Sequence, residues 1–306
     1  MAEKTYVGGQ AVIEGVMMKN KNRVAVAVRN PKGKIEVKKL PYKPKWSKPK
    51  FAKLPIFRGF LNLVDTMVLG MKALNYSANA SLEEDEKLTK KEIIGTSFFA
   101  ILFAVGIFIV LPLYITKIFV DKGFLFNLVD GVFRILIFLI YILLISLMSD
   151  VKRVFQYHGA EHKTVNCYEF GKKLTIENVS KCSLAHRRCG TTFIIIVLVI
   201  SILVFSLILW ENTLVKILGR IILIPIIAGV SYELLRLGAR YEKNILLNIL
   251  IVPGLWIQKL TTREPDKKQL AVAIKSLQAV LDKPKKKSGN KTRKKVSFKS
   301  KIKKKK

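Results

Sequence analysis

Residues 158–189 read HGAEHKTVNCYEFGKKLTIENVSKCSLAHRRC, and they hold every histidine and every cysteine of the 306-residue chain. Imidazole nitrogens and thiolates are the protein ligands that zinc and related transition metals prefer. We therefore predict a metal site in this stretch, with Zn²⁺ as the expected ion and another divalent metal as the alternative. The His and Cys residues are His158, His162, His186, Cys167, Cys182 and Cys189.

The start of the stretch, His158-Gly159-Ala160-Glu161-His162, matches the H-x-x-E-H arrangement of inverted zincin enzymes. On a helix, residues four apart lie on one face, so both imidazoles could reach one ion. Glu161 would then lie beside the ion as a candidate general base. A helix is thus expected here, and Gly171 is its expected C-terminal stop.

The third ligand is less clearly indicated. At about 100° per residue, Glu169 returns to within roughly 20° of His158, whereas Cys167 points to roughly the opposite side. A second cluster, Cys182, His186 and Cys189, lacks the C-x2-C spacing of a structural zinc ribbon. Glu169, His186 and Cys189 are the leading candidates, and Cys182 is a further one. An open site would be catalytic, whereas a shell closed by thiolates and a third His would be structural.

Uncharged apolar segments predict an α-helical polytopic membrane protein with about four transmembrane helices in two hairpins. The sequence also predicts a small N-terminal β element and a cytoplasmic His/Cys-rich loop. Two of the spans, 94–116 and 193–210, are uncharged and long enough to cross a bilayer. The other two, 131–149 and 214–235, reach that length only when flanking charged residues are included. The predicted spans are 94–116, 131–149, 193–210 and 214–235.

The formal net charge of +33 is concentrated outside these spans. Lys and Arg gather in the N-terminal 93 residues, in the 150–192 loop and after the last span, which predicts that both termini and the metal loop are cytoplasmic. Residues 283–306 contain 14 Lys or Arg and no acid, and we expect a disordered tail. Its expected partner is the anionic membrane leaflet, with RNA as an occasional one.

The remaining segments complete the predicted organisation. Strands over 23–29 and 34–40 form an expected hairpin, residues 56–74 an interfacial helix, and residues 245–257 a re-entrant or interfacial element. After Pro265, an amphipathic helix is expected to pack on the cytoplasmic domain. The chain therefore divides into 1–55, 56–92, 93–149, 150–192, 193–238, 239–282 and 283–306.

Two further acids are candidate site residues. Glu14 lies in a glycine-rich segment, 6–18, that lacks the ending of a phosphate-binding loop. Glu233 lies near the cytoplasmic end of the fourth span, where an ionisable group must be paired or functional. Its partner is expected to be Arg236, one turn later, and contact with the metal site is the alternative.

Several blocks together resemble the YqhQ-like family of bacterial membrane proteins, over residues 5 to about 281. The resemblance implies a protein of the bacterial cell membrane and a family described as uncharacterised and as candidate metal-dependent enzymes, with no reaction to carry over. The family's His-Pro-Arg-Cys-Gly-Thr block here reads His186-Arg187-Arg188-Cys189-Gly190-Thr191, and a turn without proline is less rigid. The other blocks are residues 8–18, 158–164, 188–193, 231–233 and 253–256.

The sequence leads to one functional expectation and one alternative. The first is a membrane-embedded, cytoplasm-facing metal-dependent hydrolase in which His158, His162 and a third ligand hold the metal and Glu161 takes a proton from water. Its substrate would be a lipid, a membrane peptide or a molecule delivered by a partner. The alternative is a non-enzymatic membrane scaffold in which zinc only stabilises the fold of the 150–192 loop.

Overall fold

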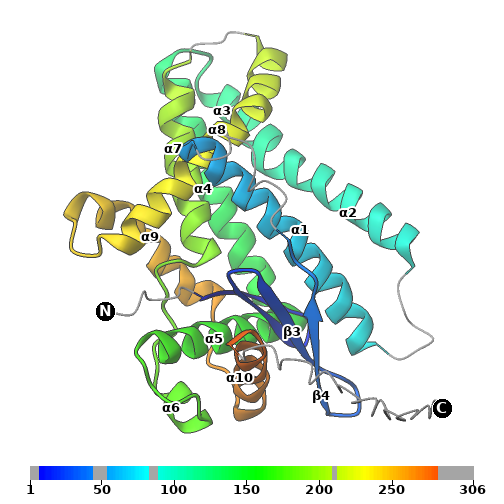
Figure 1. The fold of residues 1–306 in the computed structure, drawn as a ribbon. Helices are drawn as coiled ribbons and strands as arrows, with labels where there is room; N and C mark the ends of the chain where they lie inside the picture. Colours follow the sequence, from blue (N-terminus) through cyan, green and yellow to red (C-terminus); the bar gives the residue numbers. More distant parts are fainter. Residues whose placement is uncertain (1–6, 44–53, 83–88, 209–211, 282–306) are drawn as a thin grey trace, which may run out of the picture.

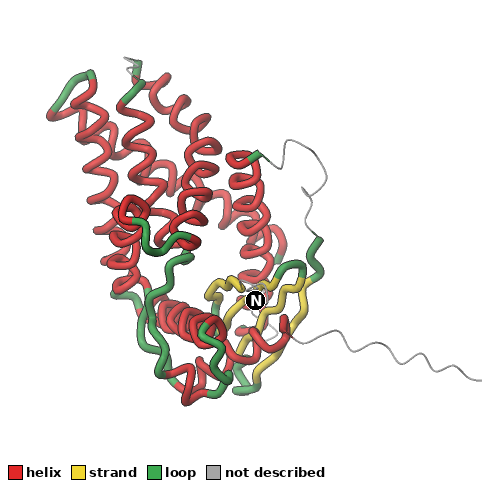
Figure 2. Tube along the Cα trace, turned by 60° about the vertical axis from the view of Figure 1, so that its left-hand side comes forward, coloured by secondary structure: helices red, strands yellow, loops and turns green. Residues whose placement is uncertain are grey.

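The computed structural model describes residues 7–43, 54–82, 89–208 and 212–281. A small β-sheet with covering helices forms one end of the molecule, and a bundle of apolar helices forms the other (Figure 1). Figure 2 shows the same separation from another side, with all the strands gathered below the bundle. The basic tail, 283–306, and part of the proline-rich linker lie outside the described residues.

The sheet is larger than the predicted hairpin. It has four antiparallel strands in the order β1-β2-β3-β4, and the predicted hairpin forms only β3 and β4. The glycine-rich segment forms the other pair, with Glu14 in the turn at a φ of 51°. Gly15 is required at its place because a Cβ there would collide with the Ala27 carbonyl oxygen of the next strand. The strands are β1 (Val7–Val12), β2 (Gly15–Asn20), β3 (Arg23–Arg29) and β4 (Ile35–Leu40).

Side chains alternate along each strand, so the sheet presents two faces. Helices cover both of them. Val16 and Met18 of β2 join a core with α5 (Ser149–Glu169) and α10 (Lys267–Leu281). Met17, between them, faces the other side and packs with helix α1 (Pro55–Ser81). The predicted amphipathic stripe of α10 is confirmed, since Leu270, Ile274 and Leu277 are buried in the first core and Leu281 packs against it.

Helix α1 connects the sheet to the bundle. It is 27 residues long, longer than the predicted segment 56–74. Leu69 and Ala73 pack on the sheet. Nearer its start, Gly59 lies against Gly229 of α8 (Thr213–Arg240), so closely that a Cβ on either glycine would collide with backbone of the other helix. The sheet and the bundle are therefore joined by one continuous element.

The bundle contains three segments long and apolar enough to cross a membrane, judged by length and composition. They are Lys91–Phe119, Phe124–Ser146 and Thr213–Arg240. The first comprises α2 (Lys90–Val105), the π-helical turn η3 (Gly106–Val110) and α3 (Leu111–Phe119), and the second is α4 (Phe124–Ser146). Many of their apolar side chains face outward, Phe98, Phe99 and Ile101 among them, as bilayer-facing side chains do.

Two shorter apolar helices complete the bundle. Helix α7 (Gly190–Ser206) has 17 residues and covers most of the third predicted span, whose last residues, 209–210, lie outside the described ranges. Helix α9 (Ile245–Thr261) also has 17 residues and continues through Pro253. The structure thus supports three of the four predicted spans by length, and the segment predicted as a re-entrant or interfacial element is one unbroken helix.

Candidate metal centre

Helix α5 presents the H-x-x-E-H residues from a fixed position. The helix is anchored in the core under the sheet by Tyr157, Ala160 and Val165, all fully buried. The helix ends at Glu169, and Gly171 follows with a φ of 69°. This is the helix and the glycine stop that the sequence predicted. The two histidines consequently project from adjacent turns of one rigid helix.

Gly159 brings a second segment close to α5. A Cβ at this position would collide with the carbonyl oxygen of Arg263. The Arg263 N–H donates to the Phe155 carbonyl oxygen at 3.0 Å. The connection between α9 and α10 is therefore held directly against α5, next to His158.

The histidine rings are oriented by backbone carbonyl groups. His158 Nδ1 lies 2.8 Å from the Thr261 carbonyl oxygen, and His162 Nδ1 contacts that of Leu184. A carbonyl oxygen only accepts, so each Nδ1 carries a proton, and in the neutral ring the lone pair is on Nε2. Backbone acceptors of this kind are the usual outer partners of histidines that ligate metals. Both rings are thus in the tautomer that metal binding requires.

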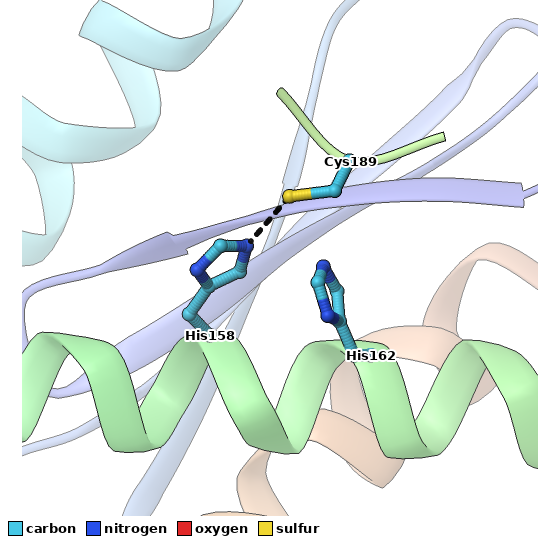
Figure 3. Close-up of side chains that lie close together, drawn as sticks. All are labelled: His158, His162 and Cys189. Carbon is cyan, nitrogen blue, oxygen red and sulfur yellow. Dashed lines mark hydrogen bonds between the residues drawn. The ribbon is translucent and has the colours of Figure 1, made fainter. Parts of the chain in front are cut away.

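Cys189 places a third potential ligand atom beside the histidines (Figure 3). Its Sγ lies 3.2 Å from His158 Nε2. Cys189 is the N-cap of α7, and its Sγ accepts from the Thr191 N–H at 3.4 Å. Ligand atoms of His158, His162 and Cys189 all lie within 4.8 Å of one another, and among the described residues these three form the only such group of His, Cys, Asp or Glu. Of the three leading candidates, the structure brings Cys189 to the histidines.

The segment before Cys189 is fixed by a buried glutamine. Gln258 of α9 accepts from the His186 N–H at 2.9 Å and donates to the His186 carbonyl oxygen at 2.9 Å. It also donates to Thr192 Oγ1 at 2.8 Å. Gln258 is 1% exposed, so these bonds are shielded from water. Sequence reasoning missed this residue, although a lone amide near the end of an apolar helix is a signal for it.

Glu161 lies at the edge of the group formed by His158, His162 and Cys189, which we call the metal group. One carboxylate oxygen is 3.6 Å from His162 Nε2, and the residue is 5% exposed. Its side chain occupies the space beside Gly9 of β1, where a Cβ would collide with it. The N-terminal glycine block and the H-x-x-E-H motif therefore meet at this point, a pairing that sequence reasoning did not predict.

Glu169 and His186 form a separate contact with each other. Glu169 Oε2 lies 3.6 Å from His186 Nε2, and Arg188 forms an ion pair with the same carboxylate. Burial opposes ionisation of Glu169, but hydrogen bonds from His186 and Arg188 and the charge of Arg188 outweigh it and lower the pKa of Glu169. The His186 ring lies 5.6 Å from that of His162. These residues border the metal group without joining it.

Cys182 lies in the core with Cys167, under the sheet. Its Sγ donates to the Asn178 carbonyl oxygen at 3.3 Å. Burial, and next the neighbouring Cys182 thiol, raise the pKa of Cys167 to about 11. Because this value exceeds that of an unfolded thiol, about 8.5, the protonated thiol stabilises the fold fully at neutral pH, and this contribution declines as the pH rises toward 11.

We expect Cys167 and Cys182 to resist alkylation in the native protein. The thiolate is the reactive form, both side chains are buried, and the pKa of Cys167 is raised to about 11. Mass spectrometry after iodoacetamide treatment should find both unmodified, and all three cysteines modified after unfolding in denaturant. Rapid native labelling of Cys167 would contradict its place in the core.

The two other candidate acids have arginine partners. Glu14 pairs with Arg153 of α5 and accepts from the Tyr157 hydroxyl at 3.2 Å. Glu233 receives two hydrogen bonds from Arg58 of α1, at 3.1 and 2.7 Å, and lies 3.7 Å from Arg236. The expected Arg236 pair is present, but the closer partner is Arg58. Neither acid belongs to the metal group.

Comparison with known proteins points to one family. A family model described as "Protein of unknown function (DUF1385)" matches residues 54–283. The chain is 36% identical over 296 residues to "Uncharacterized protein YqhQ" of Bacillus subtilis (strain 168), and the match covers 90% of this chain and 92% of the relative. No solved structure matches.

Proposed function

The chain belongs to the DUF1385 family of YqhQ-like proteins, whose function is unknown, and we propose that it is a metal-dependent hydrolase acting at a membrane surface. One observation carries the proposal. Two histidine Nε2 atoms with fixed tautomers and one cysteine Sγ converge within 4.8 Å, with a buried carboxylate beside them. Three protein ligands and a position left for water are typical of catalytic zinc sites.

The donor set fits zinc. Neutral imidazoles and a thiolate are borderline to soft ligands, which select zinc over magnesium or calcium. A bound Zn²⁺ would supply Lewis acidity and lower the pKa of a coordinated water to about 7. His158, His162 and Cys189 would hold the ion. Thr261 and Leu184 would orient the two rings through their carbonyl oxygens.

Glu161 is the proposed general base. Its carboxylate lies on the His162 side of the group, 3.6 Å from Nε2, within reach of a water molecule at the ligand atoms. In the reaction, an Oε atom of Glu161 would accept the proton of the attacking water and pass it to the leaving group. The buried position limits competing water around the carboxylate.

The position of the group suggests a substrate from the membrane. Cys189 lies at the start of α7 and Thr261 at the end of α9, and both helices are apolar. The proposed metal centre is thus at the ends of bundle helices and beside the sheet. A lipid or a membrane peptide could reach it without leaving the bilayer surface.

Replacing Glu161 by Gln should preserve metal binding and abolish hydrolysis. The amide keeps the shape but cannot accept the proton, and loss of a general base typically costs about 10²- to 10⁴-fold in rate. Membrane extracts incubated with each purified protein would be profiled for lipids and peptides, and metal content measured by mass spectrometry. Some substrate should be consumed by the wild type and spared by Glu161→Gln.

The control is Glu177→Gln, since Glu177 is an exposed acid paired with Lys181. It should behave as wild type. Equal consumption by the Glu161→Gln protein would exclude Glu161 as the base.

A second candidate function is a membrane scaffold with a structural zinc. The nearness of Glu161 to His162 favours it, because this carboxylate could close the shell as a fourth ligand. A closed site contributes folding free energy directly. Absorption of a cobalt-substituted sample would separate the two functions. Four protein ligands without a coordinated water, together with melting that depends strongly on zinc, would select the scaffold.

Placement in the cell is part of the proposal. The basic segments support a metal centre and termini that face the cytoplasm of a bacterial cell. We propose that the 283–306 tail binds the anionic leaflet, with RNA as an occasional partner. Binding of the tail to anionic vesicles should weaken as salt is added, and salt-insensitive binding would contradict an electrostatic attachment.

A further inference from the structure

A small cavity is lined by residues of α3, α4 and α8, one helix from each candidate membrane segment. The ends of these helices that line it lie away from the sheet (Figure 1). Its volume is about 60 Å³, and its walls come from α3, α4 and α8 and from the loop after α3. Phe126 of α4 and Leu113 of α3 line it on the apolar side. Its polar lining residues are Tyr114, Lys117, Asp121, Thr213 and Lys216.

The cavity lies at the depth where lipid headgroups are found. Lys117 is near the end of α3, Phe126 near the start of α4 and Lys216 near the start of α8. At a rise of 1.5 Å per residue, each is within about 5 Å of the end of its helix. If the helices span a bilayer, the ends of three hydrophobic segments mark the boundary between hydrocarbon and headgroups.

Positive charge accumulates beside the cavity. The Lys216 ammonium lies 3.7 Å from the centre of the Phe126 ring, and Lys216 is 6% exposed. One turn further along the same two helices, Asp130 binds Arg134 at 2.9 Å and Arg220 at 3.0 Å. One carboxylate thus serves two buried guanidinium groups, an excess of one positive charge in an apolar bundle.

Among the described residues of the cavity lining and of the Asp130 layer, the basic side chains are Lys117, Arg134, Lys216 and Arg220, and the acidic ones are Asp121 and Asp130. A phosphate group accepts charge-assisted hydrogen bonds from lysine.

We propose that this cavity binds the phosphate of an anionic lipid from the leaflet opposite the sheet, with Lys117 and Lys216 as its contacts. The surroundings fit a lipid better than free phosphate, because exposed apolar side chains on all three helices can take the acyl chains. They are Ile118 and Phe119 of α3, Phe124 and Leu125 of α4, and Leu214 and Val215 of α8. The proposal is independent of the metal centre.

The test uses the full chain in detergent, with thermal unfolding followed while phosphatidylglycerol is added. Zwitterionic phosphatidylcholine and inorganic phosphate are added in parallel. Phosphatidylglycerol should raise the melting temperature more than phosphatidylcholine, and inorganic phosphate should have little effect. An equal rise with inorganic phosphate would overturn the lipid assignment.

Substitutions of the lining lysines test whether phosphatidylglycerol raises the melting temperature by binding in the cavity. Lys117→Met/Lys216→Met should weaken the apparent affinity for phosphatidylglycerol about tenfold or more, since each charged contact is removed. Lys259→Met, on α9 outside the cavity lining, is the matched control and should keep the wild-type preference. The basic tail is identical in all these proteins, so its own lipid binding cancels in the comparison.

A substitution that removes a negative charge from the cavity distinguishes lost lipid binding from damage to the fold. Asp121→Asn removes an acid from the lining and should strengthen the preference for phosphatidylglycerol, a result that damage to the fold would not produce. Unchanged lipid dependence in both Lys117→Met/Lys216→Met and Asp121→Asn would refute the proposal.

Discussion

The His158→Ala/His162→Ala protein should purify without its metal. The double substitution removes two of the three ligand atoms that converge in the structure, leaving Cys189 alone. Zinc sites built from few strong ligands lose orders of magnitude in affinity with each one. Metal analysis by mass spectrometry should find about one zinc per wild-type chain and nearly none in the variant.

His186→Ala is the matched control for this result. His186 belongs to the same 32-residue stretch, but its imidazole pairs with Glu169 and lies outside the metal group. The zinc content of the variant should equal that of the wild type. Zinc loss in His186→Ala would show that the third ligand is wrongly assigned, and no zinc in any of the proteins would refute the metal centre.

The Gly159→Ala protein should be strongly destabilised, although it adds only one methyl group. That methyl would collide with the Arg263 carbonyl oxygen and the Leu184 side chain, and the backbone oxygen cannot move aside as a flexible side chain can. Overpacking typically costs about 1–3 kcal/mol, and we expect the upper part of that range. The shift should also disturb Thr261 and Leu184, which orient the two histidines.

Chemical denaturation and zinc affinity would both be measured for this variant. Gly190→Ala is the control, because Gly190 follows the proposed ligand Cys189 and a Cβ there meets nothing within 4 Å. It should retain both stability and zinc. If Gly159→Ala were as stable as Gly190→Ala, the close approach of α5 to the α9–α10 connection would be incorrect.

Periodic segments of the fold were predictable, and segments whose role depends on distant partners were not. The α5 helix, its stop at Gly171 and the stripe of α10 follow from local patterns. Strands β1 and β2 were missed because Gly8, Gly9 and Gly15 resemble a loop. At Gly9 and Gly15, what demands glycine is a neighbour far away in sequence or on another strand.

The proposed third ligand shows the limit of the angular argument. Glu169 does share a helix face with His158, but eleven residues at 1.5 Å each place it about 16 Å further along the axis. A helical wheel gives the angle of a side chain around the helix axis but not its position along the axis. The choice of Cys189 depends on the segment before it, which Gln258 of α9 fixes from 72 residues away. No local pattern around Cys189 contains that information.

Strands β2 and β3 and helix α10, which are far apart in the sequence, close the sheet layer together, and this sets the order of events during synthesis. Asn20 Nδ2 donates to the Val280 carbonyl oxygen at 3.4 Å, and Ser276 Oγ to that of Ala25 at 3.2 Å. These pairs are separated by 260 and 251 residues, or on the order of ten to fifty seconds of translation. Strands β2 and β3 must wait for α10 until the apolar helices between them have been made. The proposed metal centre must wait as well, because Thr261, the acceptor of His158, is made after α9 is nearly complete. A nascent chain stalled before that point would hold both histidines without the carbonyl group that orients the first of them.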